Sequence, residues 1–144
     1  MATILCIDDD PNVLEIHKAL LESNGYRVLI ARDGPTGIAL ARKHSVHAVV
    51  LDFNMPGMNG DQAAQVLMEE QPSTPVIIWS GRPDEIPESL KWFADSLLHK
   101  GDGPNALLSE IGKLVGAPAA DKKPRARTIR TATIGRCSRR LRSA

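Results

Sequence analysis

The chain contains little cysteine and no long apolar run, and both shortages narrow the class of protein it can be. Among its 144 residues are only two cysteines, Cys6 in an apolar run and Cys137 near the end of the sequence. They lack the spacing of a metal site or a disulfide framework, which indicates a reducing compartment. No apolar stretch approaches the ~20 residues that span a bilayer, and no basic segment precedes the first apolar run. We therefore expect a soluble, cytoplasmic protein with no leader and no transmembrane segment.

Charge is divided unevenly between two parts of the chain. Residues 1–117 contain 9 Lys and Arg against 16 Asp and Glu, a net charge of −7, whereas residues 118–144 contain 9 against 1, a net charge of +8. Apolar periodicity stops at residue 117, so we predict one domain over residues 1–116 and a disordered basic tail over residues 117–144. The tail has no aromatic residue for base stacking, so we expect of it at most weak, nonspecific contacts with nucleic acid or an anionic membrane.

Short apolar runs alternate with helical patterns along the first part of the chain. Five runs have the length of strands: 4–7, 28–31, 48–51, 76–79 and 96–98. Val13, Ile16 and Leu20 repeat at helical spacing in the first intervening segment, where Pro11 suits the first turn and Gly25 the end of a helix. Further helical patterns follow Gly34 and cover residues 63–68, 90–94 and 107–115. This alternation predicts an α/β fold with a parallel sheet covered on both faces.

Charged and hydroxyl side chains follow four of the five predicted strands: Asp8, Asp9, Asp10, Asp52, Ser80 and Lys100. Because the carboxyl ends of parallel strands meet at one edge of a sheet, we expect these residues to lie together. Two carboxylates a few ångströms apart repel by roughly 4 kcal/mol at an effective dielectric of about 20, so a cation is expected among them. Mg²⁺ takes such hard oxygen ligands and also engages phosphoryl oxygens. An aspartate at a strand end commonly caps the next helix, and we predict that role for Asp10.

Four segments, ILCIDDDP, VVLDFNMPGMNG, VIIWSG and LLHK, resemble in their order and spacing the receiver domain of bacterial two-component response regulators. The resemblance covers residues 3 to about 116 and implies a flavodoxin-like, doubly wound fold of five βα units with the parallel strands in the order 2-1-3-4-5. It also implies that Asp52 accepts a phosphoryl group from a sensor histidine kinase or a histidine phosphotransfer protein. The chain would then change its binding of a downstream protein target or relay the phosphoryl group. As no effector domain is evident after residue 116, we expect a single-domain receiver that is not itself an enzyme.

The resemblance also assigns roles to the other residues of the predicted site. It implies that Mg²⁺ is bound by Asp9, Asp52 and the backbone carbonyl of Asn54, while Asp8 orients the ion through water. Two further residues would contact the phosphoryl oxygens: Ser80 and Lys100. These roles suit phosphoryl transfer, because its transition state is highly charged and depends on alignment and neutralisation. Gly60 is expected to permit the turn into the third helix.

Three positions depart from the receiver pattern, all in the region that reads out phosphorylation. Leu97 stands where receivers commonly have an aromatic ring that swings inward, so the aromatic part of the switch is missing. Lys100 precedes Gly101 instead of a cis proline, and a non-proline cis bond costs roughly 3 kcal/mol, so we expect a trans or rearranged loop. Phe93 replaces a glycine at the end of the fourth helix, and since Phe adopts a left-handed conformation only at a cost, this helix should end differently.

Two alternative functions fit parts of the sequence. A pseudo-receiver would be a binding module without phosphate turnover, although Asp8, Asp9, Asp52, Ser80 and Lys100 are all present. Separately, Asp8 and Asp10 form a D-x-D pattern that resembles the haloacid dehalogenase phosphatases, in which the first aspartate is the nucleophile. Asn12 stands where that family commonly has Thr or Val, and its later paired acids are not evident. The two Asp-nucleophile hypotheses differ in the residue that is modified, Asp52 or Asp8.

Overall fold

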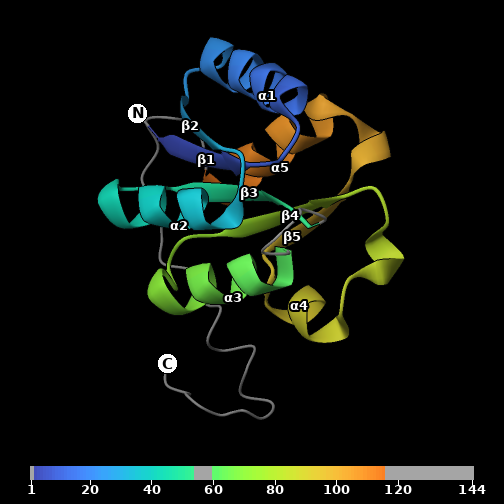
Figure 1. Cartoon of the computed structure of the whole chain (residues 1–144). Helices are drawn as coiled ribbons and strands as arrows, with labels where there is room; N and C mark the ends of the chain where they lie inside the picture. The colour runs from blue at the N-terminus through green and yellow to red at the C-terminus, as the bar shows by residue number, and fades with distance from the viewer. Residues whose placement is uncertain (1, 54–59, 116–144) are drawn as a thin grey trace.

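The structure, a computed structural model, describes residues 2–53 and 60–115 and shows three layers with a sheet in the middle (Figure 1). Asn54 and the predicted basic tail lie outside the described residues. The five strands are β1 (Thr3–Ile7), β2 (Arg27–Ala31), β3 (Ala48–Asp52), β4 (Val76–Ser80) and β5 (Ser96–His99). The helices are α1 (Pro11–Ser23), α2 (Gly34–Lys43), α3 (Gly60–Glu70), α4 (Glu88–Phe93) and α5 (Pro104–Val115), with short 3₁₀ turns η1 (Pro83–Glu85) and η2 (Lys100–Asp102).

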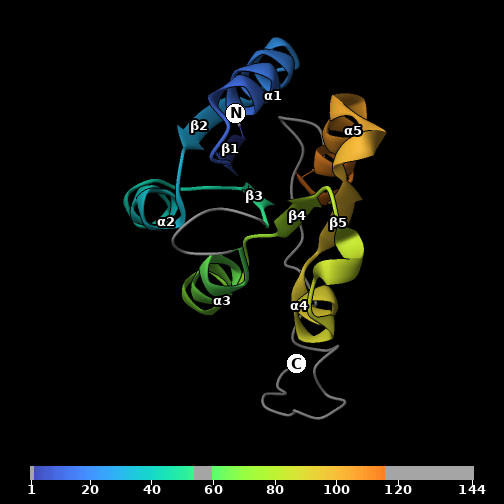
Figure 2. The ribbon, with the colours of Figure 1, turned by 45° about the vertical axis from the view of Figure 1, so that its right-hand side comes forward.

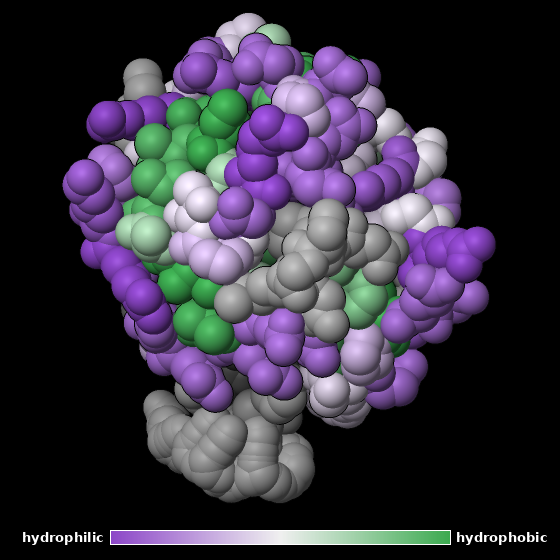
Figure 3. Space-filling view, in the orientation of Figure 1, coloured by the Kyte–Doolittle hydropathy of each residue, from purple (hydrophilic) through white to green (hydrophobic). Residues whose placement is uncertain are grey.

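The sheet has the predicted topology. Its strands are parallel and lie in the order β2-β1-β3-β4-β5, which confirms the doubly wound fold. Helices α1 and α5 cover one face, and α2, α3 and α4 cover the other (Figure 1). Figure 2 shows α4 and α5 on opposite sides of the edge strand β5. Figure 3 shows hydrophobic surface between α1 and α2, near the other edge strand, β2. Leu29 and Ile30 of β2 are half-buried.

Side chains of the strands alternate between two hydrophobic clusters, as a pleated sheet requires. Ile7, Leu51 and Ile78 belong to the cluster beneath α2, α3 and α4. Cys6 and Ile77 belong to the cluster beneath α1 and α5. Each large aliphatic side chain that is fully buried contributes about 1.5–3 kcal/mol to folding. The sheet is therefore fixed from both sides, and so are the ends of its strands.

The termini of α1 follow from local side-chain chemistry. Asp10 accepts a hydrogen bond from the backbone N–H of Asn12 at 2.9 Å, which confirms its predicted role as N-cap. Pro11 occupies the first turn, where its missing N–H leaves no bond unmade. The helix ends at Ser23, and Gly25 follows with a φ of 92°, a conformation that glycine adopts without strain.

The buried face of α1 differs from the one that the apolar repeat indicates. Leu14, His17 and Leu21 face the sheet, whereas Ile16 is 54% exposed. The helix itself is confirmed. Its apolar residues are spread over more of its circumference than the core can cover, so helical spacing alone did not separate core positions from surface positions.

Gly60 brings the start of α3 against the end of β3. Its N–H donates to the backbone oxygen of Phe53 at 2.7 Å, and a Cβ at this position would lie 2.5 Å from the Phe53 Cα. No side chain fits there, so glycine is required by close backbone approach. The contact holds the residue after Asp52 against the start of α3, while the turn that Gly60 is expected to permit lies outside the described residues.

The departures from the receiver pattern have the predicted consequences for the backbone. The described residues contain no cis peptide bond, and the Lys100–Gly101 bond is trans. Helix α4 ends at Phe93, and Ala94 follows with an extended φ of −66° and ψ of 141°, so this helix ends without a left-handed residue. Leu97 is half-buried and packs against the cluster beneath α2, α3 and α4.

Candidate functional site

The carboxyl ends of the three central strands, β1, β3 and β4, and of the edge strand β5 lie at the same end of the sheet. In the register of the sheet, Asp52 of β3 lies beside Trp79 of β4, and Ser80 lies beside His99 of β5. Ile7 pairs with Leu51, so the residues that follow β1 come level with Asp52. The topology thus brings together the acidic residues, Ser80 and Lys100, as the sequence predicts.

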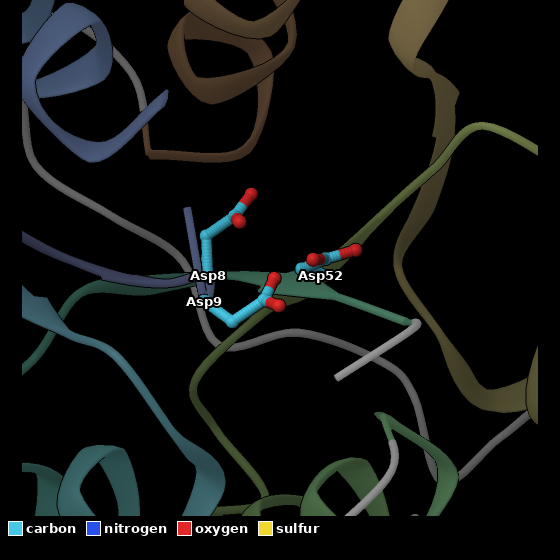
Figure 4. Close-up of side chains that lie close together, drawn as sticks. All are labelled: Asp8, Asp9 and Asp52. Carbon is cyan, nitrogen blue, oxygen red and sulfur yellow. The ribbon is translucent and has the colours of Figure 1, made fainter. Parts of the chain in front are cut away.

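Three carboxylates form a compact acidic cluster at this edge: Asp8, Asp9 and Asp52. One oxygen of each lies within 4.8 Å of the others. Figure 4 shows them at the ends of β1 and β3, with the Asp9 side chain extending toward Asp52. Asp52 is 2% exposed and Asp8 is 3% exposed, whereas Asp9 is partly exposed. The cluster is thus a set of hard oxygen donors with one side open to solvent, which suits a divalent cation such as Mg²⁺.

The buried carboxylate of Asp8 is only partly satisfied. Its Oδ1 accepts a hydrogen bond from the backbone N–H of Asp10 at 2.9 Å, whereas its buried Oδ2 has no hydrogen-bond partner. Burial, and then the negative charge of Asp52, raise the pKa of Asp8 to about 7, although the Asp10 N–H and the Lys100 ammonium act against the rise. An unpartnered buried oxygen is costly, and a bound cation or its water would relieve it.

Lys100 forms an ion pair with Asp52. Its Nζ lies 3.1 Å from Asp52 Oδ1, and the lysine side chain is 36% exposed against 2% for the aspartate. The lysine reaches from the end of β5 across β4 to β3, and its Cδ lies 3.9 Å from the place that a Cβ of Gly81 would occupy. Lys100 therefore lies over the end of β4 with its ammonium group directed at the buried carboxylate.

Ser80 ends β4 and is fully buried. Its Oγ accepts a hydrogen bond from the backbone N–H of Arg82 at 2.9 Å. The Arg82 guanidinium in turn pairs with Glu85 of η1 at 2.7 Å. The hydroxyl is thus engaged with the loop between β4 and α4, so a change at Ser80 would reach this loop first.

A buried pair next to the site escaped the sequence analysis. His17 of α1 meets Trp79 edge to face, with ring centroids 5.1 Å apart and an interplanar angle of 82°. His17 is 2% exposed, and burial followed by the charge of Lys100 lowers its pKa to about 4. The Trp79 Nε1 is buried without a hydrogen-bond partner. Nothing in the sequence indicates this pair, because His17 looks like any polar residue on an amphipathic helix.

Of two other residues named in the predicted site, one is outside the described residues and one lies away from the acidic cluster. Asn54, whose carbonyl is a predicted Mg²⁺ ligand, lies outside the described residues. Leu97 lies on β5 but packs toward α4, on the opposite face of the sheet from the cluster of Trp79 and Ile77. In the sheet, Leu97 pairs with Ile78 of β4, two residues before Ser80.

A comparison with known families matches the response regulator receiver domain over residues 4–112. The chain belongs to this family, and it is a phosphoacceptor signalling protein of the two-component class. It is 41% identical over 87 residues to the protein PilH of Pseudomonas aeruginosa, a match that covers 59% of this chain and 72% of PilH. It is 30% identical over 138 residues to the response regulator GtcR of Aneurinibacillus migulanus, with 93% of this chain but only 57% of GtcR covered.

Solved receiver structures share the fold. The response regulator TrrA of Thermotoga maritima in complex with Mg²⁺ and BeF superimposes with a TM-score of 0.74 at 26% identity, covering 79% of this chain and 99% of TrrA. TrrA in complex with the histidine kinase ThkA gives a TM-score of 0.73, also at 26% identity, with 80% of this chain and 99% of that chain covered.

Among the residues that the structure describes, no helix has both the length and the apolar character to cross a membrane.

Proposed function

We propose that Asp52 accepts a phosphoryl group from a phosphohistidine of a sensor histidine kinase or a histidine phosphotransfer protein. The observation that supports this most directly is the pairing of a buried Asp52 carboxylate with Lys100 Nζ at 3.1 Å, beside two further carboxylates. In the transfer, the N–P bond of the phosphohistidine breaks as a bond forms between phosphorus and an Asp52 oxygen. The imidazole keeps the electron pair of the broken bond and takes up a proton.

The residues present fit a Mg²⁺ site. The donors are carboxylate oxygens, and the buried Oδ2 of Asp8 has no hydrogen-bond partner. We assign the ion to Asp9, Asp52 and the backbone carbonyl of Asn54, with Asp8 holding it through water. Bound there, Mg²⁺ would neutralise charge on the phosphoryl oxygens. The TrrA structure with Mg²⁺ and BeF supports this assignment by analogy.

Lys100 and Ser80 are proposed to hold the phosphoryl group once it is on Asp52. Lys100 would exchange its pairing with Asp52 Oδ1 for one with a phosphoryl oxygen, and Ser80 would donate its hydroxyl proton to another. The acylphosphate adds negative charge and acceptor oxygens at a buried strand end, which are changes that these two side chains can follow. Because Ser80 already bonds the Arg82 N–H, the loop between β4 and α4 is the first segment to respond.

We further propose that the chain is not a stand-alone enzyme and that it works in the cytoplasm by changing partner binding or by relaying the phosphoryl group. Residues 1–116 would form the receiver, with Leu97 as a degenerate switch position. Residues 117–144 would form a basic tail that makes weak, salt-dependent contacts with anionic surfaces. The histidine kinase partner is supported by the ThkA–TrrA complex.

Treatment with acetyl phosphate and Mg²⁺ tests the assignment of Asp52. We expect the wild type and Asp8→Asn to incorporate phosphate, the variant more slowly, and Asp52→Asn to incorporate none while remaining folded. Labelling of Asp52→Asn together with loss of labelling in Asp8→Asn would support the phosphatase-like chemistry at Asp8 instead. A wild type that takes up no phosphate from this donor or from a kinase would support a pseudo-receiver.

A further inference from the structure

The turn that carries Lys100 is capped by the side chain of the residue before it. His99 ends β5, and its Nδ1 accepts a hydrogen bond from the backbone N–H of Gly101 at 2.8 Å. The bond joins the residues on either side of Lys100, so it restricts the backbone of the lysine. The Lys100 carbonyl in turn accepts from the Gly103 N–H at 3.3 Å. Lys100 therefore begins a short turn that is closed at both ends.

The position of the His99 ring leaves space only for glycine at residue 101. A Cβ at residue 101 would lie 2.8 Å from both Cε1 and Nδ1 of the His99 ring, so any side chain there would collide with the imidazole in its capping position. Proline at residue 101 would also remove the N–H that His99 accepts. The cap consequently depends on the departure from the Lys-Pro sequence that receivers commonly carry.

The turn would be loose without the cap. Gly101 and Gly103 have no side chain to restrict the backbone, and Gly103 has a φ of 85°. Lys100 nevertheless has to extend from β5 over Gly81 of β4 to reach Asp52 on β3. A small rotation of the backbone at the base of such a long side chain displaces Nζ from the carboxylate. Since residue 101 is not proline, another group has to hold the backbone of Lys100 in place.

We propose that His99 is a positioning residue for Lys100: its Nδ1, by capping the turn at Gly101, holds the lysine backbone so that Nζ meets Asp52 and later the phosphoryl group. The inference rests on the proposed phosphorylation of Asp52. His99 acts through Lys100, because the bond from its exposed ring goes to the backbone of the turn. The cap replaces the backbone restriction that a proline would supply.

Substitutions at His99 test this with a conservative rescue. His99→Leu removes the acceptor, whereas His99→Asn keeps a side-chain oxygen that can accept from an N–H two residues further on. We expect phosphorylation by acetyl phosphate in the presence of Mg²⁺ to be about two- to tenfold slower in His99→Leu, the range of one hydrogen bond. His99→Asn should stay within about twofold of the wild type. A merely structural role of the exposed ring would not separate the two variants in this way.

Gly101 supplies a second, independent variant. Gly101→Ala should slow phosphorylation by displacing the ring, and adding His99→Ala should not slow it further, because both changes remove the same cap. Amide hydrogen exchange at Gly101 and the Lys100 side-chain ammonium resonance, measured without any phosphodonor, should change in His99→Leu and not in His99→Asn.

The outcomes separate the two levels of the proposal. If the wild type is phosphorylated, and His99→Leu is phosphorylated at the same rate and has the same Lys100 resonance, the role of His99 is overturned and the proposed function stands. A wild type that takes up no phosphoryl group would overturn the proposed function, and the Gly101 exchange and Lys100 resonance would still decide whether His99 holds the lysine. Slowing in His99→Leu with rescue by Asn supports both.

Discussion

Replacing the buried His17 with leucine should change how the stability of the protein depends on pH. Burial lowers the pKa of His17 from 6.5 to about 4, with the charge of Lys100 as the second cause. In the unfolded chain the imidazole binds a proton as the pH falls through 6.5, whereas in the folded protein it stays neutral until about pH 4. Unfolding is therefore increasingly favoured across this window, and the wild type loses stability that a leucine variant keeps.

The size of the effect follows from the two pKa values. At pH 8 the imidazole is neutral in both states, so the difference between wild type and His17→Leu measures packing alone, including the lost edge contact with Trp79, worth about 0.5–1.5 kcal/mol. At pH 5 the histidine of the unfolded chain is almost fully protonated. The unfolding free energy of His17→Leu minus that of the wild type should therefore be about 2 kcal/mol larger at pH 5 than at pH 8.

Asp8 acts in the opposite sense, because its raised pKa stabilises the folded state at low pH and this stability is lost as the pH rises through about 7. Its contribution is common to both proteins and cancels in the comparison.

Urea unfolding of the two proteins at pH 8, 7, 6 and 5, with fixed ionic strength and no Mg²⁺, measures this difference directly. We expect two free-energy curves that converge or cross as the pH falls. Parallel curves, with the same difference at pH 8 and pH 5, would show that the folded protein protonates His17 as readily as the unfolded chain does. That result would refute the burial argument for this histidine.

Three further predictions concern the acidic cluster and its readout. Because the pKa of Asp8 is about 7, Mg²⁺ should displace a proton below that pH, and its affinity by calorimetry should fall up to about tenfold per pH unit; a flat profile from pH 7 to 5 would contradict this. Millimolar Mg²⁺ should raise the melting temperature of the wild type and raise that of Asp9→Asn less, since the ion binds only the folded cluster; equal increments would exclude Asp9 as a ligand. Beryllofluoride should shift amide resonances around Ser80 and Arg82 more than those of α4, Leu97 and α5; equally large changes on that face would show that the switch works without an aromatic ring.

The fold could be predicted from the sequence because its signals are local and repeated. Runs of buried strand residues, Pro11 at a helix start and Gly25 at a helix end each specify an element without knowledge of the others. Parallel topology then requires the strand ends to share one edge of the sheet. The convergence of Asp8 and Asp52 follows from that rule, and the structure confirms it.

Features that depend on how side chains fill space could not be predicted. The spacing of Ile16 resembles that of a core residue, yet it is 54% exposed because α1 is apolar around more of its circumference than the sheet covers. His17 takes a buried place that a polar residue seldom has. The cap of Gly101 by His99 has only an indirect signal, the glycine where receivers commonly have proline. Knowing that proline is absent does not identify what replaces it.

The central claim is that Asp52 is the phosphoacceptor, and the position of the acylphosphate tests it most directly. The wild type would be treated with acetyl phosphate and Mg²⁺, reduced with borohydride to convert the acylphosphate to homoserine, digested and sequenced by mass spectrometry. We predict homoserine at residue 52 and none at Asp8, Asp9 or Asp10. Homoserine at Asp8, or phosphate incorporation with residue 52 unmodified, would contradict the account.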